Sequence, residues 1–523
     1  MVRGFAPELL VPSVFPHEVE HLELIETHIS WIVLTGTVAY KFKKPVDFGF
    51  VDFSSLEKRR HACEEELRLN RRSAPTIYLG LVALVERDSG LALADAEDLR
   101  DFEPVIDYGV KMHEFPQSAQ LDRQFREGLL TSGDMDEIAA TVAALHEAAS
   151  VAEAGQPWGE PDAVAAPARE NFRHLRELAA SDEDLRILDG IAQWSENEFS
   201  ARRDLFRQRK QGGRVRECHG DLHLTNLVRL DGSILAFDCI EFNPALRWID
   251  VLSDAAFLHM DLAVRRRTDL AFRFINAYLE CCGDYPGVGV LPFYLAYRSM
   301  VRAKVATLQL QDPKIIRGER ETLERRRRRH LEFAQSLTVA RRPRLLLMHG
   351  FSGSGKTWLS ERLMEHLPAL RIRSDVERKR LHGLRADADS RSGPGSGIYT
   401  ESASRRTYKR LIDCADAMLG AGFDVVVDAA FLEDWQRRPF AELAARRGLA
   451  SVVIACNAPP ATLRQRLRER HAAGSDASEA DLGILAQQIE HAETDSVDET
   501  GTVVRVDTSR EIDIDSIRRR LPP

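Results

Sequence analysis

The spacing of apolar and polar positions predicts a strand-rich region at the start of the chain. Five runs there are typical of β-strands: 22–28, 30–35, 37–44, 77–85 and 104–112. Gly36 lies at a predicted turn between the second and third runs. The segment SSLEKRRHACEEELRLNRR (54–72) changes to a helical pattern, and Ser54 with Glu57 predicts a capping box at its start.

The pattern becomes mainly helical after about residue 125. The segment AEAGQPWGEPDAVAAPA (152–168) interrupts it, and its content of Ala, Gly and Pro predicts a surface loop. A second unusual segment, residues 318–337, contains five consecutive arginines. We interpret this run as a solvated helix face in preference to a nucleic-acid patch.

Short buried strands alternate with helices beyond residue 342. The strand-like runs in this region are LLLMHG (345–350), DVVVDAA (424–430), SVVIAC (451–456) and TVVRVDT (502–508). Such alternation predicts an α/β domain with a parallel sheet. We therefore predict a first domain over residues 1–335, with lobes at about 1–112 and 113–335, a linker over 336–342 and a second domain over 343–523.

Length and composition limit the class of protein. A chain of 523 residues is too long for one hydrophobic core, so two or three domains are expected. The net charge of −9 argues against general binding of nucleic acid or of acidic membranes. No apolar run is long enough to span a bilayer, the first residues lack a signal-peptide pattern, and the seven scattered cysteines include no C-x-x-C pair. We expect a cytoplasmic protein with reduced thiols and no membrane partner.

The segment CHGDLHLTNLV (218–228) has the residue spacing of a kinase catalytic loop. His219, Asp221 and Asn226 form H-x-D-x-x-x-x-N, and the apolar run that follows delivers Asp238 at its end. Phosphoryl transfer consists mainly of positioning and of charge neutralisation around Mg²⁺. We predict that Asp221 faces the acceptor hydroxyl, that Asn226 and Asp238 hold the metal, and that His219 orients the loop, whereas His223 is structural.

A lysine upstream completes this kinase-like set. Lys41 ends the sequence V-A-Y-K, which fits the V-A-I-K strand that carries a phosphate-binding lysine. The next helix offers Glu64, Glu65 and Glu66 as partners for the lysine, and the spacing leaves the choice open, with Glu66 as the candidate. Strand lysine, helix glutamate, catalytic loop and metal aspartate follow one another in kinase order, so we predict an ATP site.

Residues from about 20 to 330 resemble the aminoglycoside phosphotransferase family, the small-molecule branch of the protein-kinase-like fold. The resemblance rests on HGDLHLTN (219–226), on Asp238 and on LRWIDVLSDAAFL (246–258), where Asp250 and Asp254 match acidic positions of such enzymes. It implies an α+β kinase-like fold. The chain departs from protein kinases because it has no D-F-G, A-P-E or G-x-G-x-x-G sequence, so we expect a small-molecule acceptor.

The segment GFSGSGKT (350–357) matches the P-loop pattern G-x-x-x-x-G-K-[ST] and lies between a predicted buried strand and a predicted helix. Backbone N–H groups of such a loop surround phosphates at the N-terminus of a helix. Lys356 is predicted to reach the β- and γ-phosphates, and Thr357 to ligate Mg²⁺. The nucleotide-binding candidates in this loop are Gly350, Gly353, Ser354, Gly355, Lys356 and Thr357.

Residues from about 343 to 510 resemble P-loop kinases related to zeta toxins, polynucleotide kinases and gluconate kinases, a group also labelled AAA. The resemblance implies that Asp375, just beyond a strand, engages the acceptor hydroxyl, although an N-cap role is the structural alternative. It also implies that Asp428 arranges Mg²⁺ and that Arg466 and Arg470, one turn apart, belong to a lid that closes over phosphate. Ordinary surface arginines are the alternative for the last two.

The whole chain resembles bacterial fusions of an aminoglycoside-phosphotransferase-like domain with a P-loop kinase domain. We therefore predict a bifunctional ATP- and Mg²⁺-dependent kinase whose two sites act on hydroxyls of small molecules of the sugar, amino-sugar or nucleotide-sugar class. One alternative is that the second domain is a polynucleotide 5′-hydroxyl kinase that binds nucleic acid. Another is a nucleotide-dependent regulator without an acceptor. Asp221 and Asp375 both suit activation of a hydroxyl and weigh against the regulator.

Overall fold

The computed structural model describes residues 11–49, 51–88, 90–99, 103–179, 181–393, 395–473, 478–491 and 502–522. Two compact units make up the chain: one contains Met1–Ala166 and Phe206–Asp261, the other Pro167–Leu205 and Leu262–Pro523. The units divide the chain at other positions than the predicted linker over 336–342, so that boundary stays a prediction. Residues 1–10, on which the expectation of no signal peptide depends, lie outside the described residues.

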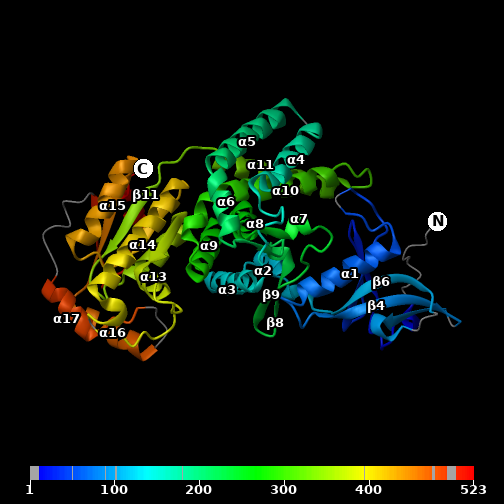
Figure 1. The fold of residues 1–523 in the computed structure, drawn as a ribbon, viewed down its shortest axis with the longest axis horizontal. Helices are drawn as coiled ribbons and strands as arrows, with labels where there is room; N and C mark the ends of the chain where they lie inside the picture. Colours follow the sequence, from blue (N-terminus) through cyan, green and yellow to red (C-terminus); the bar gives the residue numbers. More distant parts are fainter. Residues whose placement is uncertain are drawn as a thin grey trace. The chain divides into compact units, whose positions relative to one another are not determined.

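A six-stranded antiparallel sheet forms the start of the first unit, and helix α1 (Leu56–Asn70) packs against it (Figure 1, blue). The strand order is β1-β2-β3-β6-β4-β5. The strands are β1 (Glu23–Glu26), β2 (Ser30–Leu34), β3 (Val38–Lys43), β4 (Tyr78–Arg87), β5 (Gly90–Asp95) and β6 (Val105–His113). Five of them coincide with the predicted runs, whereas β5 was not predicted.

The alternation of side chains along β3 determines where its lysines lie. Tyr40 and Phe42 pack in one hydrophobic cluster of the sheet, and Ala39 packs in the other cluster, together with Cys63 of α1. Because side chains alternate between the two faces of a strand, Lys41 and Lys43 share the face of Ala39. The strand pattern therefore directs both lysines toward α1.

The start of α1 corrects the predicted capping box. Ser55 is the N-cap, and its hydroxyl oxygen accepts a hydrogen bond from the N–H of Lys58 (3.2 Å). Ser54 is not available for this role, because its hydroxyl and its N–H both donate to a carboxylate oxygen of Asp52 (2.6 and 3.0 Å). Only Ser54 has a glutamate three residues later, but its hydrogen bonds to Asp52 leave the N-cap role to Ser55.

The rest of the first unit is formed by short strands and helices around the segment of the predicted catalytic loop. That segment lies between β7 and β8, and β8 and β9 form an antiparallel hairpin. Strand β7 pairs with β10. The elements are α2 (Leu121–Arg126), α3 (Ser132–Ala148), α6 (Arg203–Gln211), β7 (Val215–Glu217), β8 (Leu227–Leu230), β9 (Ser233–Ala236), α7 (Pro244–Arg247), β10 (Trp248–Asp250) and α8 (Val251–Val264).

Five longer helices supply the first part of the second unit: α4 (Pro161–Glu177), α5 (Asp182–Ala201), α9 (Thr268–Cys282), α10 (Leu291–Gln309) and α11 (Arg317–Leu337). Helix α4 begins inside the segment 152–168 that was predicted as a loop. Pro161 can begin a helix because the first-turn N–H has no partner within the helix. The arginine run lies on α11, where most of its side chains are exposed, as expected for a solvated helix face.

A five-stranded parallel sheet of order β12-β13-β11-β14-β15 forms the rest of the second unit. Its strands are β11 (Arg344–His349), β12 (Ala369–Arg373), β13 (Asp424–Asp428), β14 (Ala450–Asn457) and β15 (Thr502–Asp507). The helices are α12 (Lys356–His366), α13 (Ser374–Arg380), α14 (Glu401–Gly420), α15 (Asp434–Arg447), α16 (Pro460–Ala473), α17 (Leu482–His491) and α18 (Ile514–Arg520). The predicted α/β class is confirmed.

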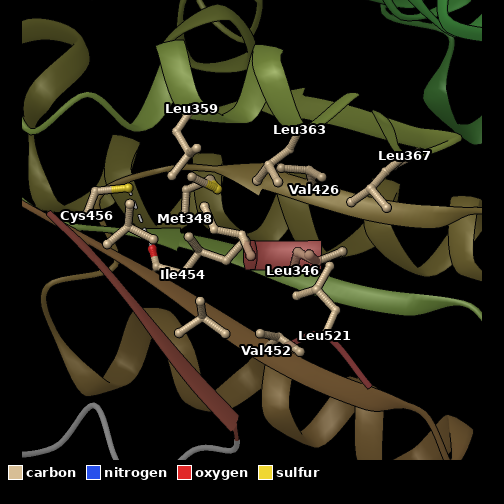
Figure 2. Packing of buried hydrophobic residues seen from close by; sticks show 14 residues of the cluster. Leu346, Met348, Leu359, Leu363, Leu367, Val426, Val452, Ile454, Cys456 and Leu521 are labelled. Atoms are coloured by element: carbon tan, nitrogen blue, oxygen red, sulfur yellow. Dashed lines mark hydrogen bonds between the residues drawn. The ribbon is translucent and has the colours of Figure 1, made fainter. Parts of the chain in front are cut away.

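The core of this sheet fixes the position of α12. Leu359 and Leu363 of α12 point toward Leu346 and Met348 of β11, and the cluster continues through Ile454 of β14 (Figure 2). All of these side chains are buried. The helix that follows the P-loop is thus held on the sheet by apolar contacts along its length. In the part of the chain that the structure describes, no helix has both the length and the apolar character needed to cross a bilayer.

Candidate active sites

The lysine of β3 lies in a buried cluster of charges. Lys41 Nζ donates hydrogen bonds to Glu66 Oε1 (2.8 Å) and to Asp238 Oδ1 (2.5 Å). Of the three consecutive glutamates, Glu66 is thus the one that contacts Lys41, because Glu64 and Glu65 accept hydrogen bonds from arginines of the same helix. The structure brings together the strand lysine, the helix glutamate and the predicted metal aspartate.

Lys43 and Glu241 extend this cluster and were not predicted from the sequence. Lys43 Nζ donates to Glu66 Oε2 (2.5 Å) and also contacts Glu241 Oε1. The side chain of Lys43 has no exposed area, and that of Glu241 is 4% exposed. Lysines at alternate positions of a strand were a visible signal for Lys43, whereas nothing local to Glu241 pointed to it. The chain of contacts runs Asp238–Lys41–Glu66–Lys43–Glu241.

The two glutamates of the cluster have pKa values shifted in opposite directions. Burial opposes ionisation of Glu66, but the ammonium groups of Lys41 and Lys43 outweigh it and hold the pKa of Glu66 below its ordinary value. Burial raises the pKa of Glu241, since the single contacting lysine, Lys43, only partly offsets it and the Glu66 carboxylate adds to it. The cluster therefore keeps the partner of Lys41 ionised.

The predicted catalytic loop is held by hydrogen bonds to its backbone. The N–H groups of His219 and Gly220 donate to the two carboxylate oxygens of Asp254 (both 2.9 Å). Gly220 has φ of +87°, and a Cβ there would lie 2.8 Å from a carbonyl oxygen, so the position requires glycine. The His219 ring lies 2.9 Å from the carbonyl oxygen of Phe237 and accepts from the N–H of Asp221 (3.3 Å). His219 therefore orients the loop.

Asp221 and Asn226 contact each other across the loop. Asn226 Nδ2 donates to the backbone oxygen of Asp221 (3.0 Å) and to its Oδ2 (3.2 Å). Because the amide nitrogen faces Asp221, the amide oxygen is left for another ligand. His223 Nε2 lies 3.2 Å from Asp221 Oδ2, and its ring packs on that of Phe257. The predicted catalytic carboxylate is thus flanked by an amide and a buried imidazole.

A buried group beside the loop has residue types that can bind metals. His146, Cys218 and Asp254 offer ligand atoms within 4.8 Å of one another. The Asp254 carboxylate, however, already accepts two backbone hydrogen bonds and lies 3.1 Å from the His146 ring. Burial raises the pKa of the Cys218 thiol well above its ordinary value, so the thiolate that a metal needs is disfavoured. We interpret the group as a support for the loop.

Asp238 follows the β8–β9 hairpin in a backbone conformation that is uncommon for aspartate. Its φ is +63°, and its N–H donates to the hydroxyl oxygen of Tyr78 (3.1 Å). The N–H of Phe237 donates to the carbonyl oxygen of Asn226 (3.0 Å), so the two predicted metal ligands lie at the same end of the hairpin. The surrounding hydrogen bonds hold the Asp238 backbone in this left-handed conformation.

The P-loop lies between β11 and α12, and its glycines are required by close contacts. A Cβ on Gly350 would lie 2.4 Å from the carbonyl oxygen of Cys456, and Gly350, Gly353 and Gly355 all have positive φ. Lys356 Nζ donates to the carbonyl oxygen of Gly350 (2.8 Å) and to the next carbonyl oxygen (2.9 Å). The lysine is therefore held across the loop that the sequence predicted as a phosphate cradle.

A cavity of about 710 Å³ opens at the P-loop. The predicted residues that line it are Gly353, Gly355, Lys356, Thr357, Asp375, Asp428, Arg466 and Arg470. Gly350 and Ser354 are not among the lining residues, and the buried Ser354 hydroxyl has no hydrogen-bond partner among the described residues. The structure thus brings most of the predicted second site to one cavity.

Asp375 and Asp428 reach this cavity from neighbouring parallel strands. Asp428 is the last residue of β13, and its Oδ2 lies 3.3 Å from the hydroxyl of Ser360. Asp375 is the second residue of α13, directly after β12. The N-cap of α13 is Arg373, so the alternative role of Asp375 as an N-cap is not observed.

The two lid candidates differ in their contacts. Arg466 donates to the carbonyl oxygens of Gly353 (3.3 Å) and Thr508 (2.6 Å), so it joins the P-loop to the end of β15. Arg470 donates to the carbonyl oxygen of Ala480. Both line the cavity, and their role in a lid stays a prediction.

Three further lining residues were missed by the sequence analysis: Arg373, Arg378 and Tyr399. Arg378 follows Asp375 by three positions, which is the spacing of one helix face and was an available signal. It donates to the carbonyl oxygen of Ile398 (3.0 Å), and its guanidinium lies 5.2 Å from the centre of the Tyr399 ring. The side of the cavity around Asp375 is therefore cationic and aromatic.

The folds and the two sites resemble those of nucleotide-dependent phosphotransferases. A family model described as an AAA domain matches residues 345–494. The chain is 31% identical over 465 residues, 89% of both chains, to the uncharacterized protein Rv2004c of Mycobacterium tuberculosis and to the uncharacterized protein Mb2027c of Mycobacterium bovis. It belongs to the family of these mycobacterial proteins.

Solved structures of kinases are also similar to parts of the chain. An amicoumacin kinase, solved with AMP-PNP, Ca²⁺ and Ami, is 12% identical, with coverage of 63% of this chain and 94% of that chain and a TM-score of 0.39. An ethanolamine kinase of Plasmodium vivax is 14% identical, and the match covers 62% of this chain and 85% of that chain with a TM-score of 0.38. A gluconokinase of Sinorhizobium meliloti is 22% identical, and the match covers 34% of this chain and 90% of that chain with a TM-score of 0.24.

Proposed function

We propose that the protein is a bifunctional kinase with two separate sites, each of which transfers the γ-phosphoryl group of ATP to a hydroxyl of a small molecule of the sugar, amino-sugar or nucleotide-sugar class. The observation that carries the proposal is that the same three kinds of side chain, one lysine and two carboxylates, occur at both sites. Each site has a lysine, a carboxylate in position to hold a metal, and a further carboxylate for the acceptor: Lys41, Asp238 and Asp221 in one site, and Lys356, Asp428 and Asp375 in the other.

At the first site, Asp221 would orient the acceptor hydroxyl and accept its proton as the phosphoryl group transfers. Its contacts with Asn226 and His223 support this role, because they fix the carboxylate at the loop. Lys41 would bind phosphate oxygens, and its bond to Glu66 ties its side chain to α1. The set of groups thus orients a nucleophile and neutralises phosphate charge.

The metal candidates offer the oxygen ligands that Mg²⁺ prefers. At the first site these are the carboxylate of Asp238 and the amide oxygen of Asn226, whose nitrogen is turned to Asp221. At the second site they are the hydroxyl of Thr357 and the carboxylate of Asp428, which both line the cavity. When bound, Mg²⁺ would neutralise charge on the transferring phosphates.

The second site supports an acceptor that carries negative charge. Arg373 and Arg378 line the cavity on either side of Asp375 in the sequence. Buried arginines recognise phosphates and carboxylates through paired hydrogen bonds. A nucleotide sugar or a sugar acid has such a group. The same arginines favour a second candidate, a polynucleotide 5′-hydroxyl kinase, because a phosphodiester would also satisfy them.

The test is a screen for ADP release with the full-length protein and a library of soluble hydroxyl compounds. Each acceptor found is then assayed with Asp221→Asn and with Asp375→Ala. We expect two groups of acceptors, each lost in only one variant. Stimulation by single-stranded oligonucleotides that is lost in Asp375→Ala would favour the polynucleotide kinase. ADP release that no acceptor increases would contradict both kinase proposals and favour a regulator.

A further inference from the structure

The outer edge of the parallel sheet is covered by a helix that the sequence analysis assigned to the first domain. Strand β12 is the edge strand, and helix α9 contacts it within the same compact unit. Asn276 Nδ2 donates to the carbonyl oxygen of Ala369 (2.9 Å), and the N–H of Arg371 donates to Asn276 Oδ1 (2.6 Å). The side-chain amide of Asn276 thus bonds to β12 as a neighbouring strand would.

One turn further along α9, Glu280 contacts two arginines of β12. Arg373 NH1 donates to Glu280 Oε1 (2.9 Å), and Arg371 NH2 lies 3.5 Å from Oε2. The backbone oxygen of Glu280 also accepts from Arg380, the last residue of α13. Helix α9 therefore holds the strand, the turn after it and the end of the short helix that carries Asp375.

These contacts reach the cavity of the P-loop site. Arg373 lines the cavity two positions before Asp375. Arg371 NH1 donates to the Ser360 hydroxyl (3.2 Å), which lies 3.3 Å from Asp428 Oδ2. Asp428 is the proposed metal ligand. A carboxylate outside the P-loop region thus connects with both the acceptor side and the metal side of the site.

We propose that Glu280 is a positioning residue of the P-loop site: with Asn276 it holds β12 in place and keeps Arg373 and Asp375 in the geometry that aligns the acceptor. This inference rests on the proposed function of that site. A carboxylate that binds a planar guanidinium fixes its direction as well as its charge. Glu280 reaches the metal side only through Arg371, which Glu361 also contacts (3.3 Å), whereas its contact with Arg373 is not shared, so the effect specific to Glu280 concerns the acceptor.

The test compares Glu280→Gln with Glu361→Gln in the full-length protein. Both substitutions remove one negative charge near Arg371, because Glu361 lies 3.3 Å from Arg371 NH1, but only Glu280 contacts Arg373. Misplacement of about 1 Å can lower a rate about 100-fold. For Glu280→Gln we expect kcat/KM for the acceptor to fall roughly 10- to 100-fold, with the KM for ATP and the acceptor-independent hydrolysis within about twofold of wild type. Glu361→Gln should resemble the wild type.

Hydrogen exchange of peptides from residues 369–380 gives a second measurement that needs no acceptor. Exchange should accelerate in Glu280→Gln and not in Glu361→Gln. Adding Glu280→Gln to Arg373→Gln should lower acceptor turnover no further, since the proposed effect acts through Arg373. Unchanged exchange in Glu280→Gln, or equal kinetic losses in both glutamate variants, would overturn the positioning role. If the wild type phosphorylates no acceptor, the proposed function fails, while the exchange measurement still decides whether Glu280 positions β12.

Discussion

The buried cluster beside β3 gives a quantitative prediction for Lys43. Its ammonium group contacts Glu66 Oε2 and Glu241 Oε1, and its side chain has no exposed area. Lys43→Met keeps most of the volume of the side chain and removes the charge. Glu66 retains Lys41 at 2.8 Å, but Glu241 loses the lysine that partly offsets its burial. The variant therefore isolates the cost of one buried carboxylate.

The expected size of the effect follows from this geometry. Breaking a buried ion pair by removing one partner costs about 3–5 kcal/mol, whereas replacing both partners with apolar groups is often neutral. Lys43→Met should therefore destabilise the first unit by about 3–5 kcal/mol, and Lys43→Met combined with Glu241→Leu should recover most of the loss.

Burial raises the pKa of Glu241, so the folded state binds its proton more readily than the unfolded state does. The stability of Lys43→Met should therefore fall as pH rises above about 4.5, the ordinary value, and recover as pH falls.

Hydrogen exchange of peptides from β3 and α1 across a urea series is the appropriate assay, because a chain of 523 residues does not unfold in one two-state transition. Glu241→Leu alone completes the double-mutant cycle and should itself be destabilising, since it leaves Lys43 with one carboxylate. A double variant no more stable than Lys43→Met, or a loss below about 1 kcal/mol in Lys43→Met, would show that the cluster is not the tightly coupled unit that its distances indicate.

Four further predictions concern the two sites. Asp221→Asn should lower turnover of a first-site acceptor by at least about 100-fold while calorimetry shows unchanged ATP affinity, because we propose that the carboxylate orients the acceptor and takes its proton. Asp375→Ala should lower acceptor phosphorylation at the P-loop by about 100-fold or more and leave slow ATP hydrolysis intact; loss of ATP binding instead would assign Asp375 to the metal or to the fold. Lys356→Ala should abolish turnover at the P-loop but not turnover of first-site acceptors, and a loss of both would show that the sites are not independent. Burial lowers the pKa of His349 to about 4 from an ordinary 6.5, so the unfolded state takes up a proton first. Stability of the second unit should thus fall by up to roughly 3 kcal/mol as pH drops from 6.5 to 4, and His349→Asn should flatten this dependence in pH-resolved hydrogen exchange.

The sequence predicted those parts of the sites that depend on local spacing. The catalytic loop from His219 to Asn226 and the P-loop are contiguous, and each has a pattern that its chemistry requires. The choice among Glu64, Glu65 and Glu66 could not be made, because it depends on how α1 is rotated against the sheet. The contact of Lys43 with Glu241 joins residues 198 positions apart and has no local pattern. The choice of Ser55 over Ser54 depended on a side chain outside the capping motif.

The cover that α9 gives to β12 has a consequence for how the protein is made. An open strand edge is a ready template for pairing with another chain, and Asn276 occupies two hydrogen-bonding groups of this edge, the Ala369 carbonyl and the Arg371 N–H. Asn276 precedes Arg371 by 95 residues, so during synthesis the helix leaves the ribosome before the strand that docks on it. A P-loop segment made alone from residue 343 would lack this partner and present its edge strand to other chains. Because the chain carries the helix ahead of the sheet, we expect less misassembly of the full-length protein than of a segment that starts at residue 343.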